Sequence, residues 1–351
     1  MSCGRNEKRT AIIYALLAAA FYAVNVPASK FLLSGVGPMT MAALLYLGAG
    51  IGIAVMSLAF NLVSKRKEQE KFKKSDLPFV IGMIVLDIAA PICLMLGLRY
   101  GSSSNASLLG NFEIVATTVI ALLIFKENIS KRLWTAIALI TLSSLILSFE
   151  GADSLRFSRG SLLVLLAAVC WGFENNCTRK ISSKSAYEIV ILKGIFSGTG
   201  SLAIALAVRE HMPDLANIPP TLLLGFVSYG LSIFLYVKAQ NILGAAKTSA
   251  YYAVAPFIGA FFAFAFLRER LTGVYLIALA VMIAGTVLVV ADTLVKNHLH
   301  EHQHIFTHTH DGVTHMYIIT HSHWHNHYRS NEKHNHYHTG KELENALAMS
   351  R

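Results

Sequence analysis

Residues 39–62 read MTMAALLYLGAGIGIAVMSLAFNL and contain no charged side chain. About 20 apolar residues in a helix cross the hydrocarbon core of a bilayer. A helix also satisfies its backbone hydrogen bonds within the segment, as lipid requires. This stretch therefore predicts a transmembrane helix. Nine other stretches have the same character, so the ten expected spans are 11–33, 39–62, 78–98, 104–125, 132–149, 160–179, 187–208, 219–240, 249–267 and 271–291.

The composition of the 351-residue chain agrees with a membrane protein, since 54% of its residues are hydrophobic and only 14% are charged. An average soluble domain carries about 25% charged residues. Residues 1–292 hold 25 Lys and Arg against 15 Asp and Glu, whereas residues 293–351 hold five of each. We interpret the basic excess as loop charge that orients membrane spans, and we expect no nucleic-acid partner.

The distribution of basic residues between alternate loops predicts the orientation of the spans. With a cytoplasmic N-terminus, the inside loops before residue 293 hold 16 Lys and Arg and the outside loops hold seven. Cytoplasmic loops are enriched in Lys and Arg, so we expect a multi-pass plasma-membrane protein with both termini in the cytoplasm. The stretch 11–33 follows a short basic segment, as a signal peptide would, but its length favours an uncleaved first span.

The sequence repeats itself weakly after five spans. With a shift of 149 residues, Ala18–Ala23 lies over Ala167–Gly172, and after the 63–77 loop a shift of 142 places Ser107 over Ser249. An odd number of spans in each copy inverts the second copy, which is a recurrent transporter architecture. We therefore expect an all-α membrane protein with two inverted five-helix repeats and a mostly disordered tail. The expected domains are 1–149, 150–292 and 293–351.

The ten-span plan, together with three short segments, resembles a known family. Phe125-Lys126-Glu127 closes the fourth span, Leu267-Arg268-Glu269 closes the ninth, and the segment 244–256 opens the ninth. Over residues 11–291 these features are similar to the EamA branch of the drug/metabolite transporter superfamily. The resemblance implies a multi-pass carrier of small metabolites that in many members exports its substrate.

Polar and charged side chains within the expected spans are candidates for a substrate or proton site. Charged groups at bilayer depth are costly and generally face a cavity or a partner. Two interpretations are open: these groups line a cavity between the halves, or a carboxylate such as Glu113 or Glu174 forms a structural ion pair with Lys193. The candidates are Asn25, Asp87, Glu113, Glu174, Asn175, Lys193 and Tyr251.

Local sequence patterns also bear on the shape of the spans. Pro91 follows Asp87 by four residues and could break the helix and open a polar pocket. The fourth span has Glu113-Ile114 where the ninth has Ala255-Pro256, the proline being usual in the family that the chain resembles. GxxxG spacing predicts close helix packing in the second and seventh spans. The four glycines concerned are Gly48, Gly52, Gly194 and Gly198.

The tail is rich in histidine, because 14 of the 15 histidines of the chain lie within 298–338. Neutral imidazole is a good ligand for zinc, nickel, cobalt and copper, so we expect the tail to bind these ions. No cofactor is otherwise required. The candidate ligands are His298, His300, His302, His304, His308, His310, His315, His321, His323, His325, His327, His334, His336 and His338.

The middle of the tail has the pattern of a β-hairpin. Asp311-Gly312 is a two-residue turn signal between the β-prone runs 305–310 and 313–319. Such a turn pairs His310 with Val313 and His308 with His315. Alternation then puts His304, His308, His310 and His315 on one face.

We expect a secondary transporter of a small organic metabolite, with export as one option, whose tail binds metal. One alternative is a divalent transition-metal transporter, and another is a membrane-anchored metal buffer. An enzyme is not expected, because the sequence has no Walker loop, nucleophile elbow or metalloprotease signature. The expected partners are the lipid bilayer and a small-molecule substrate, and a homodimer is left open.

Overall fold

The computed structural model describes residues 5–63, 71–125, 130–148, 158–243, 248, 251–269, 272–294, 296–310 and 313–327. The chain divides into two compact units, Met1–Val290 and Ala291–Arg351. All regular structure described in the first unit is helical.

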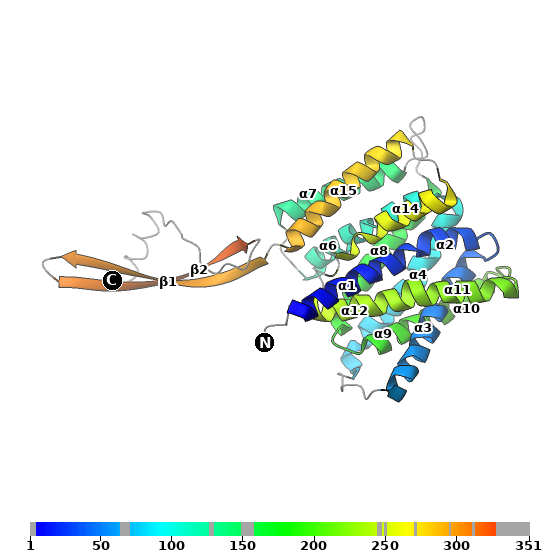
Figure 1. The fold of residues 1–351 in the computed structure, drawn as a ribbon, viewed down its shortest axis with the longest axis horizontal. Coiled ribbons are helices and arrows are strands. Elements are labelled where there is room, and N and C mark those ends of the chain that lie inside the picture. The colour runs from blue at the N-terminus through cyan, green and yellow to red at the C-terminus, as the bar shows by residue number, and fades with distance from the viewer. Residues whose placement is uncertain are drawn as a thin grey trace. The chain divides into compact units, whose positions relative to one another are not determined.

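The helices of the first unit form a bundle in which segments far apart in the sequence pack together (Figure 1). The first half contributes α1 (Arg5–Ala23), α2 (Asn25–Leu32), α3 (Pro38–Val63), η1 (Lys74–Asp76), α4 (Leu77–Tyr100), α5 (Ser103–Leu109), α6 (Phe112–Phe125) and α7 (Lys131–Ser148). The second half contributes α8 (Arg159–Ile181), α9 (Ala186–Leu192), η2 (Lys193–Ser197), α10 (Gly198–Ala207), η3 (Leu215–Asn217), α11 (Ile218–Gly225), η4 (Phe226–Leu231), α12 (Ser232–Leu243), α14 (Ala255–Leu267) and α15 (Gly273–Leu294).

Seven helical segments in the described part of the chain are long and apolar enough to cross a membrane. They coincide with seven of the ten expected spans: Glu7–Leu32, Pro38–Phe60, Lys74–Tyr100, Arg159–Ile181, Ala186–Ala207, Leu215–Leu243 and Gly273–Asp292. The expected fourth, fifth and ninth spans coincide with α5–α6, α7 and α14, which are outside this set. The fourth is interrupted between α5 and α6, and α14 has only 13 residues.

The two halves are interleaved. Helix α4 packs along α8, α3 packs against α10 and α11, and α1 packs against α12 and α14. Glycines allow these close approaches, because a Cβ atom at Gly194 would overlap the backbone of Gly50, and one at Gly160 would overlap that of Gly97 and Gly101. The glycines expected from GxxxG spacing are all at close contacts, so that prediction is confirmed.

Helices α7 and α15 pair at one edge of the bundle (Figure 1). The Ser143 hydroxyl donates a hydrogen bond of 2.7 Å to the carbonyl of Ala278. Ile140 and Met282 are fully buried in a cluster that also includes Val115 of α6. The last span of each half therefore packs at the periphery, away from the seam between α4 and α8.

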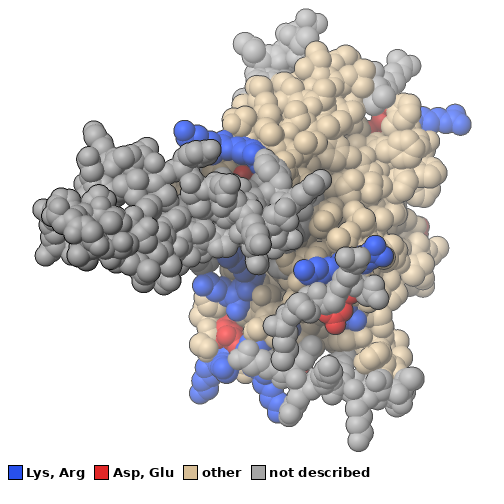
Figure 2. All heavy atoms as spheres, turned by 60° about the vertical axis from the view of Figure 1, so that its left-hand side comes forward, with Lys and Arg blue, Asp and Glu red and all other residues tan. Residues whose placement is uncertain are grey.

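The surface of the first unit is apolar, as contact with lipid requires. Figure 2 shows a surface without Lys, Arg, Asp or Glu over much of the face turned to the viewer. Large apolar side chains are exposed on several helices, among them Leu58, Leu123 and Phe266, with exposed fractions of 65%, 72% and 74%. Such contiguous apolar exposure is typical of a surface that contacts lipid or another protein.

Pro91 does not break its helix, contrary to the option drawn from the sequence. Helix α4 runs without interruption from Leu77 to Tyr100 with Pro91 inside it. The proline has no N–H to donate to the carbonyl of Asp87, four residues earlier. The helix tolerates this loss because neighbouring helices surround it on the side where both residues are buried.

The second unit contains an antiparallel two-stranded hairpin, whereas the described part of the first unit is all-α, as expected. Strand β1 (Lys296–His310) pairs with β2 (Val313–His327). The two strands have 15 residues each and continue well beyond the expected runs 305–310 and 313–319. Neither strand contains Gly or Pro, the residues that interrupt a ladder.

The pairing of the hairpin follows the expected register. His310 pairs with Val313, and His308 pairs with His315, so this prediction is confirmed. The expected turn residues, Asp311-Gly312, lie outside the described residues, as do His334, His336 and His338.

Candidate functional site

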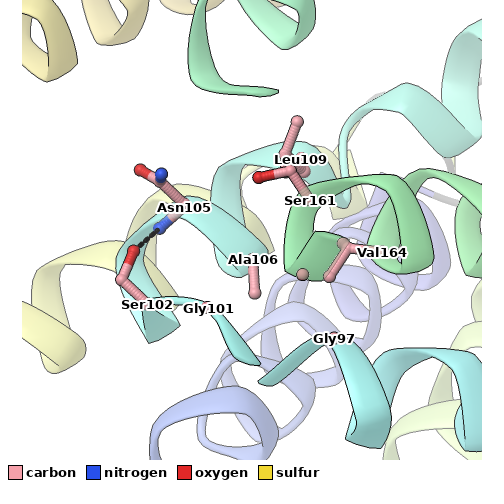
Figure 3. A pocket seen from close by; sticks show the side chains of 9 residues that line it. Gly97, Gly101, Ser102, Asn105, Ala106, Leu109, Ser161 and Val164 are labelled. Atoms are coloured by element: carbon pink, nitrogen blue, oxygen red, sulfur yellow. Dashed lines mark hydrogen bonds between the residues drawn. The ribbon is translucent and has the colours of Figure 1, made fainter. Parts of the chain in front are cut away.

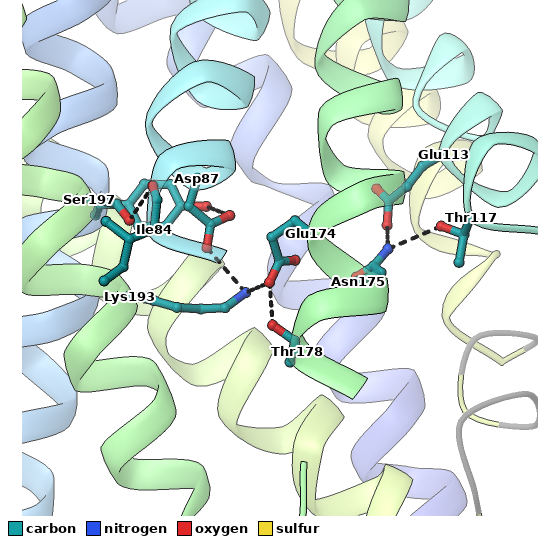
Figure 4. Close-up of polar contacts among 10 residues, drawn as sticks. Ile84, Asp87, Glu113, Thr117, Glu174, Asn175, Thr178, Lys193 and Ser197 are labelled. Atoms are coloured by element: carbon teal, nitrogen blue, oxygen red, sulfur yellow. Dashed lines mark hydrogen bonds and ion pairs between the residues drawn. The ribbon is translucent and has the colours of Figure 1, made fainter. Parts of the chain in front are cut away.

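Three charged side chains from three helical segments meet inside the first unit, and we call them the buried charge cluster: Asp87 on α4, Glu174 on α8 and Lys193 on η2 (Figure 4). The Lys193 Nζ atom lies 3.2 Å from Asp87 Oδ2 and 2.6 Å from Glu174 Oε1. The Tyr46 hydroxyl donates a hydrogen bond of 2.7 Å to Asp87 Oδ1. The Thr178 hydroxyl donates one to Glu174.

The cluster is almost completely shielded from solvent, with exposed fractions of 0% for Asp87, 3% for Glu174 and 4% for Lys193. Removing charges from water costs several kcal/mol for each ion unless partners compensate it. Here two carboxylates share one ammonium group, so the cluster has a net charge of −1 when all three groups are ionised. One negative charge is left that Lys193 does not balance.

The packing of the helices explains how the cluster is assembled. Gly97 and Gly160 bring the α4 and α8 backbones together, which places Asp87 and Glu174 across the same seam. Lys193 is the first residue of the π-helical segment η2. Such π segments within α-helices occur frequently at functional sites. The first half thus supplies Asp87, and the second half supplies the other two charges.

A second polar group surrounds Glu113, beside the buried charge cluster in Figure 4. The Asn175 side-chain amide donates hydrogen bonds of 2.6 Å to Glu113 Oε1 and 3.4 Å to the Thr117 hydroxyl. Asn175 directly follows Glu174 on α8, so the two acidic groups approach the same helix. Glu113 lies in the first turn of α6, where the helix dipole favours a negative charge.

The fourth and ninth spans are both interrupted at matching positions. The chain turns at Gly110–Asn111 before α6 and at Ala253–Val254 before α14, and these turns are one residue apart under the shift of 142. Pro256 lies in the first turn of α14. Paired interruptions in the two halves of a repeat are the best sequence indicator of a transporter binding site. Glu113-Ile114 in place of Ala255-Pro256 does not remove the interruption from the first half.

Tyrosines form a third group, which the sequence analysis missed. The Tyr229 ring lies with its centroid 5.0 Å from that of Tyr46 and 6.0 Å from that of Tyr22. Tyr252 lies 5.8 Å from Tyr22 and 5.1 Å from Tyr236. Tyrosine is normally enriched at the membrane interfaces. A tyrosine in the middle of an expected span, such as Tyr229, is the signal that could have revealed this group.

Six of the seven candidate residues belong to these three groups, and Tyr251 is the exception. Asn25 donates a hydrogen bond of 3.2 Å to the Tyr229 hydroxyl and therefore joins the tyrosines. The ion pair of Glu174 with Lys193, one of the two open interpretations, is present. Glu113 is held by Asn175 instead, and Tyr252 rather than its neighbour Tyr251 is the member of the tyrosine group.

A small crevice lies between α4, α5 and α8 (Figure 3). Gly97 and Gly160 form one side of it, and Ser102 accepts a hydrogen bond of 3.2 Å from the Asn105 N–H at the start of α5. Its volume is about 10 Å³, roughly the space that one water molecule needs, so it is far too small for a metabolite. Gly97 is ten residues from Asp87 along α4, a separation of roughly 15 Å, so this crevice is not the buried charge cluster.

Two carboxylates join the halves at one end of the bundle. Glu210 accepts hydrogen bonds of 3.2 and 2.7 Å from the Met39 and Thr40 N–H groups at the start of α3. Glu269 accepts bonds of 2.7 and 2.8 Å from the Ser103 and Ser104 N–H groups at the start of α5. Both carboxylates belong to the second half and both helices to the first. The starts of α3 and α5 are at the same end because α4 returns between them, so the four hydrogen bonds link the two halves at this end.

Interleaved apolar helices around buried charges, with paired interrupted spans, define the class of multi-pass membrane transport proteins. The family follows from a sequence model of the EamA-like transporter family, which matches residues 9–149 and again residues 158–291. The chain belongs to this family. The two successive matches confirm the duplication that the sequence predicts.

Two proteins with similar sequences are named as transporters. The chain is 26% identical to an uncharacterized transporter of Methanothermobacter thermautotrophicus over 287 residues, which cover 77% of this chain and 83% of the relative. It is 23% identical to the uncharacterized transporter YyaM of Bacillus subtilis, with coverages of 68% and 82%. One solved crystal structure has the same fold, with a TM-score of 0.58 at 14% identity and coverages of 82% and 97%.

Proposed function

We propose that this chain is a secondary transporter of a small organic metabolite in the plasma membrane, coupled to protons through the buried charge cluster. The observation that carries the proposal is the shared ammonium of Lys193, which bridges a carboxylate of each half. A contact between the halves at this depth is where an inverted-repeat transporter binds its substrate and coupling ion.

The proposed coupling of transport to protons rests on the contacts that cross between the two halves of the first unit. Asp87 and Tyr46 both belong to the first half, whereas Glu174, Thr178 and Lys193 belong to the second. If the halves separate, Lys193 keeps Glu174 and Asp87 keeps only the Tyr46 hydroxyl. An uncompensated carboxylate at this depth is costly. We infer that Asp87 takes up a proton when the halves separate and releases it when Lys193 returns.

The hydrogen bonds of Glu210 and Glu269 support a conformation closed at one end. By the charge distribution of the loops this is the outer end, with both termini in the cytoplasm. Opening toward the outside requires Glu210 and Glu269 to break their hydrogen bonds with the N–H groups at the starts of α3 and α5. Proton entry then drives export of the substrate. The proton concentration gradient and the membrane potential across a plasma membrane both favour proton entry.

A divalent-metal transporter has less support from the first unit. Within the described residues of the first unit, no group of three or more His, Cys, Asp or Glu side chains could hold a metal ion. The ammonium of Lys193 lies between the two carboxylates, where it would repel a metal cation. We therefore prefer an organic substrate.

The test uses the purified chain in proteoliposomes. A metabolite extract is offered, and the compounds that accumulate under an imposed pH gradient are identified by mass spectrometry. We expect Asp87→Asn to abolish accumulation against a gradient but to retain exchange of labelled for unlabelled substrate, because exchange needs no net proton movement. Glu188→Gln, an exposed carboxylate five residues before Lys193, is the matched control.

Two outcomes separate the parts of the proposal. Wild-type accumulation by both Asp87→Asn and Glu174→Gln would leave the cluster a purely structural role. Accumulation of Zn²⁺ or Ni²⁺ but of no organic compound would favour the metal transporter instead.

A further inference from the structure

The hairpin of the second unit pairs histidine with histidine across its ladder. Four register pairs consist of two histidines each: His298 with His325, His300 with His323, His302 with His321, and His308 with His315. The first three pairs follow one another at every second position. The composition of a histidine-rich tract does not indicate which histidines lie opposite one another. The register of the hairpin does.

The register also assigns all the histidines of the hairpin to a single face. Successive residues of a strand alternate between faces, and directly paired residues share a face. The histidines of β1 are at even-numbered positions from 298 to 310, and each of these positions pairs with an odd-numbered position of β2. The histidines of β2 are all at odd-numbered positions from 315 to 327. Eleven histidines therefore share one face, and the other face has none.

We propose that this face, which we call the histidine ladder, is a binding site for several divalent first-row transition-metal ions. Residues paired directly across an antiparallel ladder have Cβ atoms about 4.5–5.5 Å apart. Imidazole nitrogens bind zinc at about 2.0–2.1 Å, so two paired histidines can bracket one ion. Adjacent pairs are roughly 6.8 Å apart along the strands, and two adjacent pairs supply the four nitrogen ligands that such ions accept.

Metal binding and hairpin formation should depend on each other. A two-stranded hairpin by itself is only marginally stable in water. An ion that binds the paired strands and not the unpaired chain stabilises the hairpin by mass action. At a free zinc concentration 100 times Kd, a single site makes the hairpin open about 100-fold less often. The inference does not depend on the proposed transport function, because it rests on the second unit alone.

Protons compete with the metal for the same nitrogens. Metal binding to imidazole requires the deprotonated nitrogen. The groups that share the face of the histidine ladder within the described strands are Lys296, Phe306, Val313, Tyr317 and Ile319, and Glu301 is on the other face.

The experiment uses the full chain in detergent micelles after removal of metal with EDTA. Zinc is titrated by calorimetry, bound zinc is counted by elemental analysis, and backbone hydrogen exchange is followed by mass spectrometry with and without zinc. We expect at least two zinc ions per chain and slower exchange over 298–310 and 313–327. A variant that ends at Thr293 should bind none of these ions.

A composition-matched variant separates the ladder from a simple histidine tract. Exchanging Leu299 with His300 and His323 with Trp324 moves one histidine pair to the opposite face while it keeps every residue type. We expect this variant to lose at least one bound zinc and part of the protection from exchange. His334→Ala/His336→Ala removes two histidines outside the strands and should change neither.

The outcomes decide between the two kinds of binding. Equal zinc content and equal protection in the exchanged variant and the wild type would overturn the histidine ladder and leave an unstructured chelating tract. Absence of zinc binding at pH 7 would overturn metal binding altogether. Zinc binding without slower exchange in either strand would also contradict the proposal, since the paired strands are the site.

Discussion

Replacing Lys193 with Met should destabilise the first unit by about 3–5 kcal/mol, the range for removing one partner of a buried ion pair. The side chain is 6% exposed, and its Nζ atom lies within 3.2 Å of carboxylate oxygens of Asp87 and Glu174. Methionine is similar in length and volume, so little packing is lost. The main cost is two buried carboxylates left without a cation.

Neutralising the whole cluster tests whether that cost is electrostatic. The variant D87N/E174Q/K193M has no buried charge at this position and should recover most of the lost stability, because neutral replacements of a buried ion pair are often as stable as the pair. If the cost came from lost packing instead, the triple variant would be no more stable than Lys193→Met alone.

Thermal unfolding in detergent micelles measures the effect. At roughly 2 °C per kcal/mol for a domain of this size, Lys193→Met should lower the Tm by about 6–10 °C. Lys238→Met is the matched control, since its Nζ atom lies 4.5 Å from the centre of the Phe234 ring and such a contact contributes about 0.5–1 kcal/mol. Tm values of the two variants within about 2 °C of each other would refute the reasoning.

Four further predictions concern topology, the second acidic group, the closed end and the tail. Reporter fusions after residues 70 and 155 should be cytoplasmic and external, and the opposite result would invert the topology. Glu113→Gln should lower the transport rate while normal amounts of protein reach the membrane, and an unchanged rate would make Glu113 structural. Glu269→Gln weakens two hydrogen bonds to the start of α5, so labelling of a cysteine placed at Asn105, near that start, should become faster than in the wild type. A chain that lacks residues 293–351 should retain transport in vesicles, whereas complete loss at normal membrane levels would favour delivery of metal by the tail.

Much of the fold follows from the sequence because lipid leaves few alternatives. An apolar stretch such as 39–62 can satisfy its backbone groups only as a helix, and its length then fixes its ends closely. The hairpin register was also predictable, since Asp311-Gly312 between alternating runs permits one pairing. The duplication could be read from weak matches because the order of spans repeats as well as the residues.

The partners of the buried charges could not be predicted in the same way. Helices such as α4 are apolar on nearly all sides, so their sequences do not indicate which side faces which neighbour. Asp87, Glu174 and Lys193 could be named as candidates, but their meeting depends on lateral packing at Gly97 and Gly160. The sequence therefore offers Glu113 and Glu174 as equal candidates for Lys193, and packing selects Glu174.

The repeat makes the two halves alike in backbone but not in chemistry. Asn25 and Glu174 occupy matching positions under the shift of 149, yet Asn25 binds the Tyr229 hydroxyl and Glu174 binds Lys193. In the proposed cycle, the ammonium of Lys193 stays with the second half while the halves separate and rejoin. Asp87 is then the carboxylate whose partner changes, so the proposal gives this one group a charge that depends on which side is open.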